Sequence, residues 1–144
     1  MTRVLIIDDE APIRLLCRVN LEAEGMDVLE ASDGESGIET ARRGRPDVIL
    51  LDVMMPRLDG WSVAQVLVRD ELTKEMPIIF LTARAEVRDR ARGLDIGGIE
   101  YVTKPFNPLE LAPLIESLLE RIRRDGLDLL RGEKLAELRS LVHE

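Results

Sequence analysis

The sequence contains little cysteine and no long apolar run, which bears on disulfide formation and on membrane insertion. Cys17 is the only cysteine among the 144 residues, which rules out an intramolecular disulfide and suits a reducing cytoplasm. We expect Cys17 to be a small buried hydrophobe on the first helix. No apolar run approaches the ~20 residues of a membrane span, and the chain runs straight into an expected strand, which disfavours a signal peptide. We therefore expect a cytoplasmic protein without a membrane segment.

Positive charge is also scarce. The chain has 20 basic and 28 acidic residues, a net charge of −8. Proteins that bind nucleic acid directly use a basic surface, so this excess of acidic residues argues against direct nucleic-acid binding. A basic protein partner remains compatible with the charge. The length and the hydrophobic content of 45% fit one globular domain with a real core.

Short apolar runs alternate with helical patterns along the chain. Four runs end at polar residues: Val4 to Ile7 before Asp8-Asp9, Val48 to Leu51 before Asp52, Ile78 to Leu81 before Thr82, and Ile99 to Thr103 before Lys104. Runs of this kind indicate strands that are buried in a parallel sheet. We expect strands near 3–8, 26–31, 47–52, 77–82 and 99–103.

The segments between the strands carry helix start and stop signals. The first pattern stops at Gly25, the second runs from Asp33 to Gly44, the third begins at Asp59 or Gly60, the fourth covers 86–96, and the fifth opens at Asn107-Pro108. Five such units predict an α/β fold with a doubly wound five-stranded parallel sheet in the order 2-1-3-4-5 and helices on both faces.

The last part of the chain carries two apolar stripes at helical spacing. The first, from Leu111 to Ile122, belongs to the fifth helix, and residues 123–126 break it. The second is weaker, follows Gly132 and consists of Leu135, Leu138, Leu141 and Val142. We expect a domain at 1–122 and a helical extension or linker at 123–144, with a break at the glycines rather than one long coiled coil. The extension is too short for a DNA-binding output domain and has no basic face.

The polar residues at the strand ends predict an ion-and-phosphate site. In an open parallel sheet, ligands bind at the carboxyl ends of the strands where the strand order reverses. Asp8, Asp9 and Asp52 would meet there with Thr82 and Lys104. Three crowded carboxylates repel one another, and a hard divalent ion such as Mg²⁺ relieves the repulsion.

Simpler interpretations exist for each residue alone. Asp8 and Asp9 could cap the first helix, and Thr82 could cap the fourth. Lys104 could be a solvated surface charge, although Lys104-Pro105 is an X-Pro bond that could be cis and aim the lysine over the site. The shared position on four strands favours a common site.

Four motifs give the chain a family resemblance. They are Val4-Leu5-Ile6-Ile7-Asp8-Asp9-Glu10, the run from Asp52-Val53-Met54-Met55-Pro56 to Asp59-Gly60, Leu81-Thr82-Ala83-Arg84, and Tyr101-Val102-Thr103-Lys104-Pro105-Phe106. Residues 3 to about 120 resemble the receiver domain of a two-component response regulator, similar to the single-domain chemotaxis regulators. The resemblance implies a flavodoxin-like receiver fold.

The resemblance also implies roles for individual residues. Asp52 would be the phosphoacceptor, and Asp8, Asp9, Asp52 and the backbone carbonyl of Met54 would hold Mg²⁺. Thr82, Lys104, Met54 and Ala83 would contact the phosphoryl group. Thr82 and Tyr101 would form the switch, although Tyr101 could also be ordinary strand packing. The partner would be a sensor histidine kinase or a phosphotransfer protein, and the chain would catalyse only its own phosphorylation and dephosphorylation.

One stretch departs from the family pattern. Gly97-Gly98-Ile99-Glu100 stands where Gly-Ala-Asp-Asp is usual, which affects the expected signalling face formed by the fourth helix, fifth strand and fifth helix. The second stripe should pack either on the body or on a second chain. We favour a homodimer through this face, assisted by the C-terminal extension and strengthened by phosphorylation.

Three rival functions fit the sequence less well. A dehalogenase-like phosphohydrolase needs a second acid two residues after Asp52, where Met54 stands. A flavodoxin-type FMN module needs a hydroxyl-rich loop after the first strand. A receiver that has lost phosphorylation would not keep the acidic set with Thr82 and Lys104.

Overall fold

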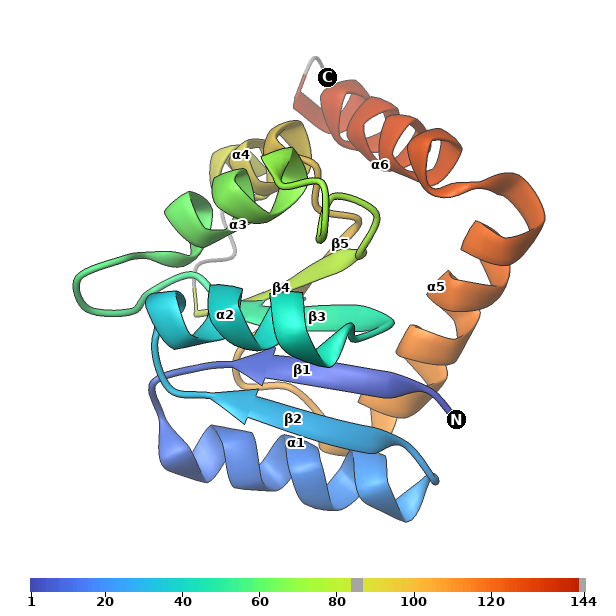
Figure 1. Ribbon diagram of the computed structural model, residues 1–144. Coiled ribbons are helices and arrows are strands. Elements are labelled where there is room, and N and C mark those ends of the chain that lie inside the picture. The colour runs from blue at the N-terminus through green and yellow to red at the C-terminus, as the bar shows by residue number, and fades with distance from the viewer. Residues whose placement is uncertain (84–86, 143–144) are drawn as a thin grey trace.

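Five parallel strands form the centre of the computed structural model, which describes residues 1–83 and 87–142 (Figure 1). The strands are β1 (Arg3–Ile7), β2 (Asp27–Ala31), β3 (Val48–Asp52), β4 (Ile78–Thr82) and β5 (Glu100–Thr103). They are hydrogen-bonded in the order β2-β1-β3-β4-β5. This order is the predicted one, and each strand boundary lies within one residue of its predicted range.

Helices cover both faces of the sheet (Figure 1). The helices are α1 (Ala11–Ala23), α2 (Gly34–Gly44), α3 (Gly60–Arg69), α4 (Val87–Ile96), α5 (Leu111–Asp125) and α6 (Leu127–Val142). Successive strand residues point to opposite faces. Val4 and Ile6 therefore pack with α1 and α5, while Leu5 and Ile7 pack with α2 and α3. Every residue of β3 and β4 is buried, as strands covered on both faces should be.

Side chains of the residues before two helices cap them as the sequence predicts. The carboxylate of Asp33 accepts a hydrogen bond from the backbone N–H of Ser36, and that of Asp59 accepts one from Ser62. Asn107 also caps, but it caps the single 3-10 turn η1 (Pro108–Glu110) that precedes α5. Of the predicted fourth helix, α4 is described from Val87, and its expected start at residue 86 lies outside the described residues.

The C-terminal extension folds back onto the body. Gly126, at φ +91°, ends α5, which confirms the predicted break there. A second break at Gly132 does not occur, since α6 runs through it without interruption. In α6 the side chains of Leu127, Leu130 and Leu138 are buried, whereas the side chains of residues 141 and 142 lie outside the described part. Because α5 continues to Asp125, the boundary between 1–122 and 123–144 falls inside a helix and stays a prediction.

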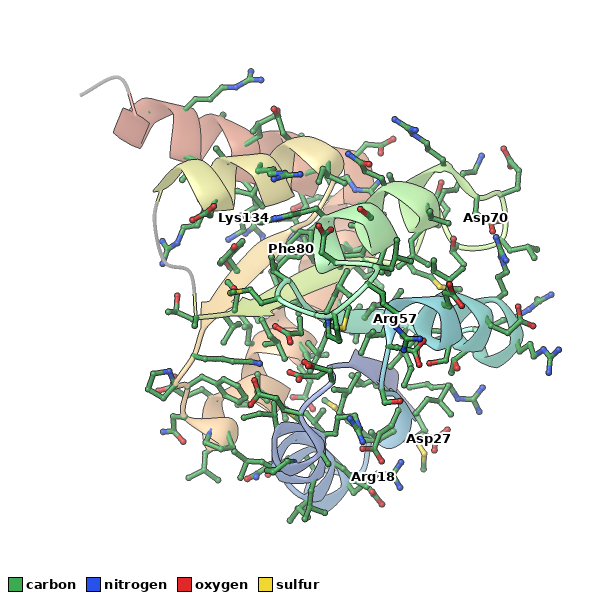
Figure 2. All side chains as sticks on the ribbon, turned by 90° about the vertical axis from the view of Figure 1, so that its left-hand side faces the viewer. Arg18, Asp27, Arg57, Asp70, Phe80 and Lys134 are labelled. Atoms are coloured by element: carbon green, nitrogen blue, oxygen red, sulfur yellow. The ribbon has the colours of Figure 1, made fainter. Side chains whose placement is uncertain are left out.

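Helix α6 packs beside α4 and α5, along the β5 edge of the sheet (Figures 1 and 2). The predicted stripe is therefore buried within the chain at Leu138. No helix in the described ranges has the length and apolar character needed to cross a membrane.

Glycine lets α4 and the link after it lie directly on an aromatic cluster. The cluster consists of Trp61, Phe80 and Tyr101, with ring centroids 5.2 Å apart for Trp61–Phe80 and 5.8 Å apart for Phe80–Tyr101. A Cβ on Gly93 would lie 2.9 Å from Cδ2 of Phe80, and one on Gly98 would lie 2.4 Å from Cε2. Both contacts are closer than a side chain can make, so α4 sits on the rings only because these residues are glycine.

Gly98→Ala should therefore destabilise the fold by about 1–3 kcal/mol, because the added methyl must push the link between α4 and β5 away from Phe80. Gly132→Ala is the matched control, since its Cβ would meet nothing within 4 Å. That change should stabilise the chain by up to ~1 kcal/mol, because alanine favours a helix interior. Urea unfolding of both variants measures the difference, and equal free energies of unfolding would contradict the packing argument.

Candidate metal and phosphoryl site

The polar residues predicted at the strand ends lie at one edge of the sheet. Figure 2 views the molecule from the side toward which the strands point. Asp52 is the last residue of β3, and Asp8 follows β1, which is hydrogen-bonded to β3. Thr82 ends β4, and Lys104 follows β5. The predicted convergence of these four residues is confirmed.

Lys104 joins the acidic residues. Its Nζ lies 2.8 Å from Oδ2 of Asp8, 3.5 Å from Oδ1 of Asp52 and 3.8 Å from Oε1 of Glu10. The Lys104-Pro105 bond is cis. Lys104 is therefore no solvated surface charge, because its ammonium group lies between three carboxylates and is mostly buried.

Asp8 is a site residue and not a helix cap. The residue at the N-cap of α1 is Glu10, and no side chain caps that helix. One carboxylate oxygen of Asp8 pairs with Lys104, and the other accepts the backbone N–H of Glu10 at 2.9 Å. The Asp8 side chain is fully buried, so its charge acts mainly on its neighbours rather than on water.

Burial and crowding make the charged form of Asp52 unfavourable. Removal from water is the largest cause, and the nearby charge of Asp8 adds to it. Lys104 and the backbone N–H of Met54, 3.3 Å from Oδ1, oppose the rise, and the pKa of Asp52 is still raised to about 7. Burial also disfavours the charge on Lys104. Its hydrogen bond to Asp8 and the surrounding carboxylates outweigh that effect and raise the pKa of Lys104.

The carboxylates form a set that a hard cation fits. One oxygen each from Asp8, Asp9, Glu10 and Asp52 lies within 4.8 Å of the others. Oδ2 of Asp52 is buried and accepts no hydrogen bond from any residue in 1–83 or 87–142. Asp9 and Glu10 are exposed, so this buried oxygen lies next to groups that water reaches. A buried oxygen without a donor, beside other carboxylates, is suited to a divalent ion with oxygen ligands.

The site also involves Glu10, Arg14 and Gly60, for which the sequence predicts no site role. Glu10 continues the acidic run of Asp8-Asp9, which was the available signal. Arg14 Nη1 donates to the backbone oxygen of Asp8 at 2.7 Å, and only the fold reveals this contact. A Cβ on Gly60 would lie 2.3 Å from the backbone oxygen of Asp52, so the glycine lets α3 begin against the end of β3.

The remaining predicted residues line the same edge. Thr82 is buried, its backbone oxygen accepts the N–H of Lys104 at 2.8 Å, and Ala83 follows it at the surface. Met54 is 54% exposed next to Asp52. Tyr101 is only 9% exposed and belongs to the aromatic cluster. Arg84 of the third motif lies outside the described residues.

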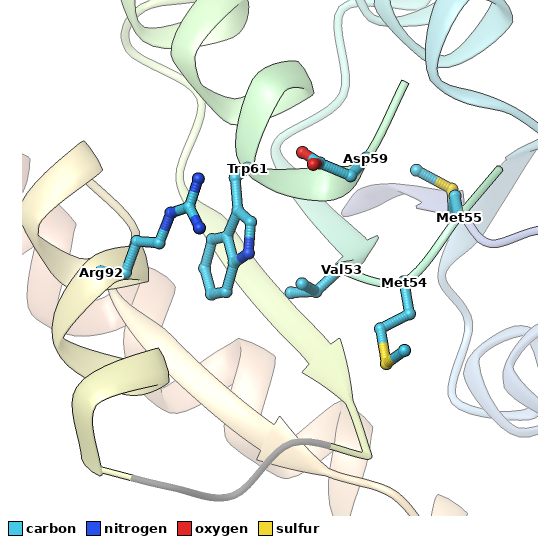
Figure 3. A pocket seen from close by; sticks show the side chains of 6 residues that line it. All are labelled: Val53, Met54, Met55, Asp59, Trp61 and Arg92. Carbon is cyan, nitrogen blue, oxygen red and sulfur yellow. The ribbon is translucent and has the colours of Figure 1, made fainter. Parts of the chain in front are cut away.

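A pocket of about 430 Å³ lies between the loop after β3 and α4 (Figure 3). Its lining consists of Val53, Met54, Met55, Asp59, Trp61 and Arg92. The guanidinium of Arg92 lies over the Trp61 ring, 5.2 Å from its centroid, which is cation–π distance. Residues next to the site therefore contact α4 directly.

Comparison with known proteins identifies the family. A family model described as the response regulator receiver domain matches residues 4–116. The chain is 44% identical over 124 residues to the DNA-binding dual master transcriptional regulator RpaA of Synechocystis, covering 86% of this chain and 52% of that protein. It is 43% identical over 119 residues to the alkaline phosphatase synthesis transcriptional regulatory protein PhoP of Bacillus subtilis, covering 83% and 49%.

Solved structures agree with this match. The chemotaxis protein CheY4 of Vibrio cholerae superposes with a TM-score of 0.77 at 31% identity, covering 81% of this chain and 98% of that one. The chain belongs to the response regulator receiver domain family, a family of two-component signalling proteins. It spans about half the length of the curated relatives it matches.

The raised pKa of Asp52 predicts a pH-dependent effect of Asp52→Asn in magnesium-free buffer. An unfolded aspartate ionises near pH ~3.9, whereas folded Asp52 ionises at about 7. Between these values the folded state holds the extra proton, so rising pH removes stability. Asparagine cannot ionise, and the variant should gain on the order of 1–3 kcal/mol over wild type at pH 8 and less at pH 5.

Urea unfolding at both pH values provides the measurement. Asp95→Asn, on an exposed residue at the end of α4, is the control and should change stability by less than about 0.5 kcal/mol. A gain for Asp52→Asn that is the same at pH 5 and pH 8 would show that Asp52 ionises normally.

Proposed function

We propose that Asp52 is the phosphoacceptor of a two-component signalling switch and that Mg²⁺ assists the transfer. The observation that carries this proposal is the Asp52 carboxylate, which is buried, borders Lys104 on one oxygen and has no hydrogen-bond donor on the other within the described residues. A buried carboxylate of this kind lowers the stability of the fold unless a cation and an incoming phosphoryl group complete its surroundings.

In the proposed step a carboxylate oxygen of Asp52 attacks the phosphorus of a phosphohistidine. An O–P bond forms, the P–N bond breaks, and the imidazole nitrogen keeps the electron pair and takes up a proton. The product is an acyl phosphate on Asp52. The nucleophile must be ionised, and the positive charge of Lys104 favours that form.

The other residues would position the phosphoryl group and neutralise its negative charge. Asp9, Asp52 and the Met54 carbonyl would hold Mg²⁺ directly, and Asp8 would act through water. The bound ion would supply positive charge for the phosphoryl oxygens. Lys104, the Thr82 hydroxyl and the N–H groups near Met54 and Ala83 would contact the phosphoryl group. Glu10 borders the same set and would orient water on the exposed side.

The alternative functions fit the site less well. A phosphohydrolase of the dehalogenase type would need an acid at position 54, and Met54 there is largely exposed and neutral. An FMN phosphate would meet Asp8, Asp9 and Glu10, whose charges repel it. A scaffold without phosphorylation would have no reason to retain a buried carboxylate whose Oδ2 lacks a donor within residues 1–83 and 87–142.

The partner would be a histidine kinase or a phosphotransfer protein. Helix α1 begins directly after the acidic residues and exposes an apolar row, with Leu15 at 60% and Val19 at 58%. A donor protein that brings phosphohistidine to Asp52 would cover this row. The net charge of −8 supports a protein partner rather than nucleic acid. Thr82 and Tyr101 would transmit the change, and a homodimer through α4, β5 and α5 remains part of the proposal.

We further propose a cytoplasmic location and no reaction beyond the chain's own phosphorylation and dephosphorylation. Cys17 is a free thiol and the only cysteine of the sequence, which suits a reducing compartment. It is fully buried, and burial raises its thiol pKa to about 12. A thiol of that pKa is unreactive at neutral pH.

Magnesium should raise the melting temperature, because it binds only the folded carboxylate set. At a concentration of 100 times Kd the gain is about 2.7 kcal/mol. Asp9→Ala should remove most of this response, whereas Asp27→Ala, which alters an exposed aspartate paired with Arg3, should keep it. If magnesium changes neither the melting temperature nor the fluorescence of Trp61, a cation site at these carboxylates is excluded.

A small phosphodonor with Mg²⁺ should add one phosphoryl group to the full chain, and the adduct should be labile to base. Asp52→Asn should abolish it, because an amide is not a competent nucleophile. Intact mass before and after base treatment measures the adduct, with Asp95→Asn as the control that should still accept the group. An adduct that persists in Asp52→Asn, or that maps to serine or threonine, would refute the assignment.

A further inference from the structure

Helix α6 is attached to the body at defined points. The guanidinium of Arg131 donates to the backbone oxygen of Gly97 at 2.8 Å and to that of Lys74 at 3.2 Å. The Nζ of Lys134 lies 3.0 Å from Oε2 of Glu100. Burial lowers the pKa of Arg131, because removal from water disfavours the charged guanidinium. The hydrogen bonds to the two backbone oxygens must offset this loss of hydration.

The attachment involves three residues of the stretch from Gly97 to Glu100, in which positions 98–100 depart from the family pattern. Gly97 supplies its carbonyl at φ +129°, and Gly98 packs on Phe80. Ile99 is fully buried and shares a hydrophobic cluster with Leu127 and Leu130 of α6. Glu100 forms the ion pair with Lys134. An aspartate at position 99 would place a charge in this apolar cluster, so the departure and the docked helix belong together.

The same contacts reach the proposed switch. Glu100 is the first residue of β5, and its other carboxylate oxygen accepts the backbone N–H of Tyr101 at 3.0 Å. The strand has only four residues, Glu100 to Thr103, and Lys104 follows it directly. Lys104 also donates its backbone N–H to Thr82, the last residue of β4. A shift of the Lys104 backbone toward a phosphoryl group would therefore pull on β5, and through this hydrogen bond it would strain the pairing of β5 with β4.

Arg131 is sensitive to such a movement. Its two acceptors belong to different links, since Lys74 lies before β4 and Gly97 lies before β5. Sliding β5 along β4 separates the two carbonyls, and the rigid guanidinium fork cannot then serve both. One hydrogen bond to a buried charge would be lost.

We propose that α6 is an intramolecular latch on the β5 edge, held by Arg131 and Lys134 and released when the site is phosphorylated. This inference rests on the proposed function for its trigger, whereas the docked state rests on the contacts themselves. While α6 is docked, it covers the α4 and β5 surface. Release uncovers that surface.

Amide hydrogen exchange of residues 127–142 in the full chain tests the latch. Without phosphoryl mimic, Arg131→Ala should raise exchange in this segment about tenfold, because it removes two hydrogen bonds from a charged donor. Arg139→Ala is the matched control. Its 3.7 Å contact with Asp95 joins two largely exposed groups, so exchange should change less than about twofold. Equal exchange in both variants would overturn the latch.

Magnesium and beryllofluoride test the trigger. In wild type they should raise exchange in 127–142, and in Arg131→Ala they should add little, because that helix is already released. Lys134→Ala should lie between the two. If the mimic raises the melting temperature but leaves wild-type exchange unchanged, the coupling is refuted while the proposed function stands. If the mimic does not bind, the proposed function and the trigger both fail, and the Arg131 comparison still decides whether α6 is latched.

Discussion

The Lys104 ammonium group carries one positive charge and faces more negative charge than it can balance. The other properties of the site follow from this excess of negative charge. Lys104 faces the buried carboxylates of Asp8 and Asp52 and, farther away, Glu10. The sheet order forces the crowding, because β1 and β3 are neighbours and both end at this edge. Gly60 prevents relief by movement, since α3 begins against the backbone of Asp52. The remaining negative charge is the physical basis for a cation and, with it, for phosphoryl chemistry.

The edge strand β5 imposes a second constraint on the fold, because its outer backbone groups have no neighbouring strand in the described part of the chain. β5 has a neighbour on one side only, and an uncovered edge offers its backbone groups to other chains. Here α6 lies beside that edge, bound through Arg131 and Lys134. Glu100, which pairs with Lys134, directly precedes Tyr101, so edge protection and the proposed signal path share part of the same backbone. A change at the site therefore bears on whether this surface is accessible.

Patterns that depend on burial could be predicted from the sequence, because strands covered on both faces leave uninterrupted apolar runs. The strand order and the meeting of Asp8, Asp52 and Lys104 followed from them. Choices set by tertiary contacts could not be predicted. Gly132 costs a helix only about 1 kcal/mol, and packing of α6 on the body exceeds that cost, so no break occurs there. Whether Asp8 caps α1 or faces Lys104 depends equally on a partner 96 residues away.

That separation has a consequence for how the protein is made. The acidic residues near position 8 emerge from the ribosome before the lysine that balances them, which follows 96 residues later. Contacts of such long range form late and slow the search for the native topology. Until β5 has joined the sheet, the carboxylates lack Lys104 as a partner, and their charges repel one another at the edge of the proposed site. Completion of the sheet therefore also completes the proposed site.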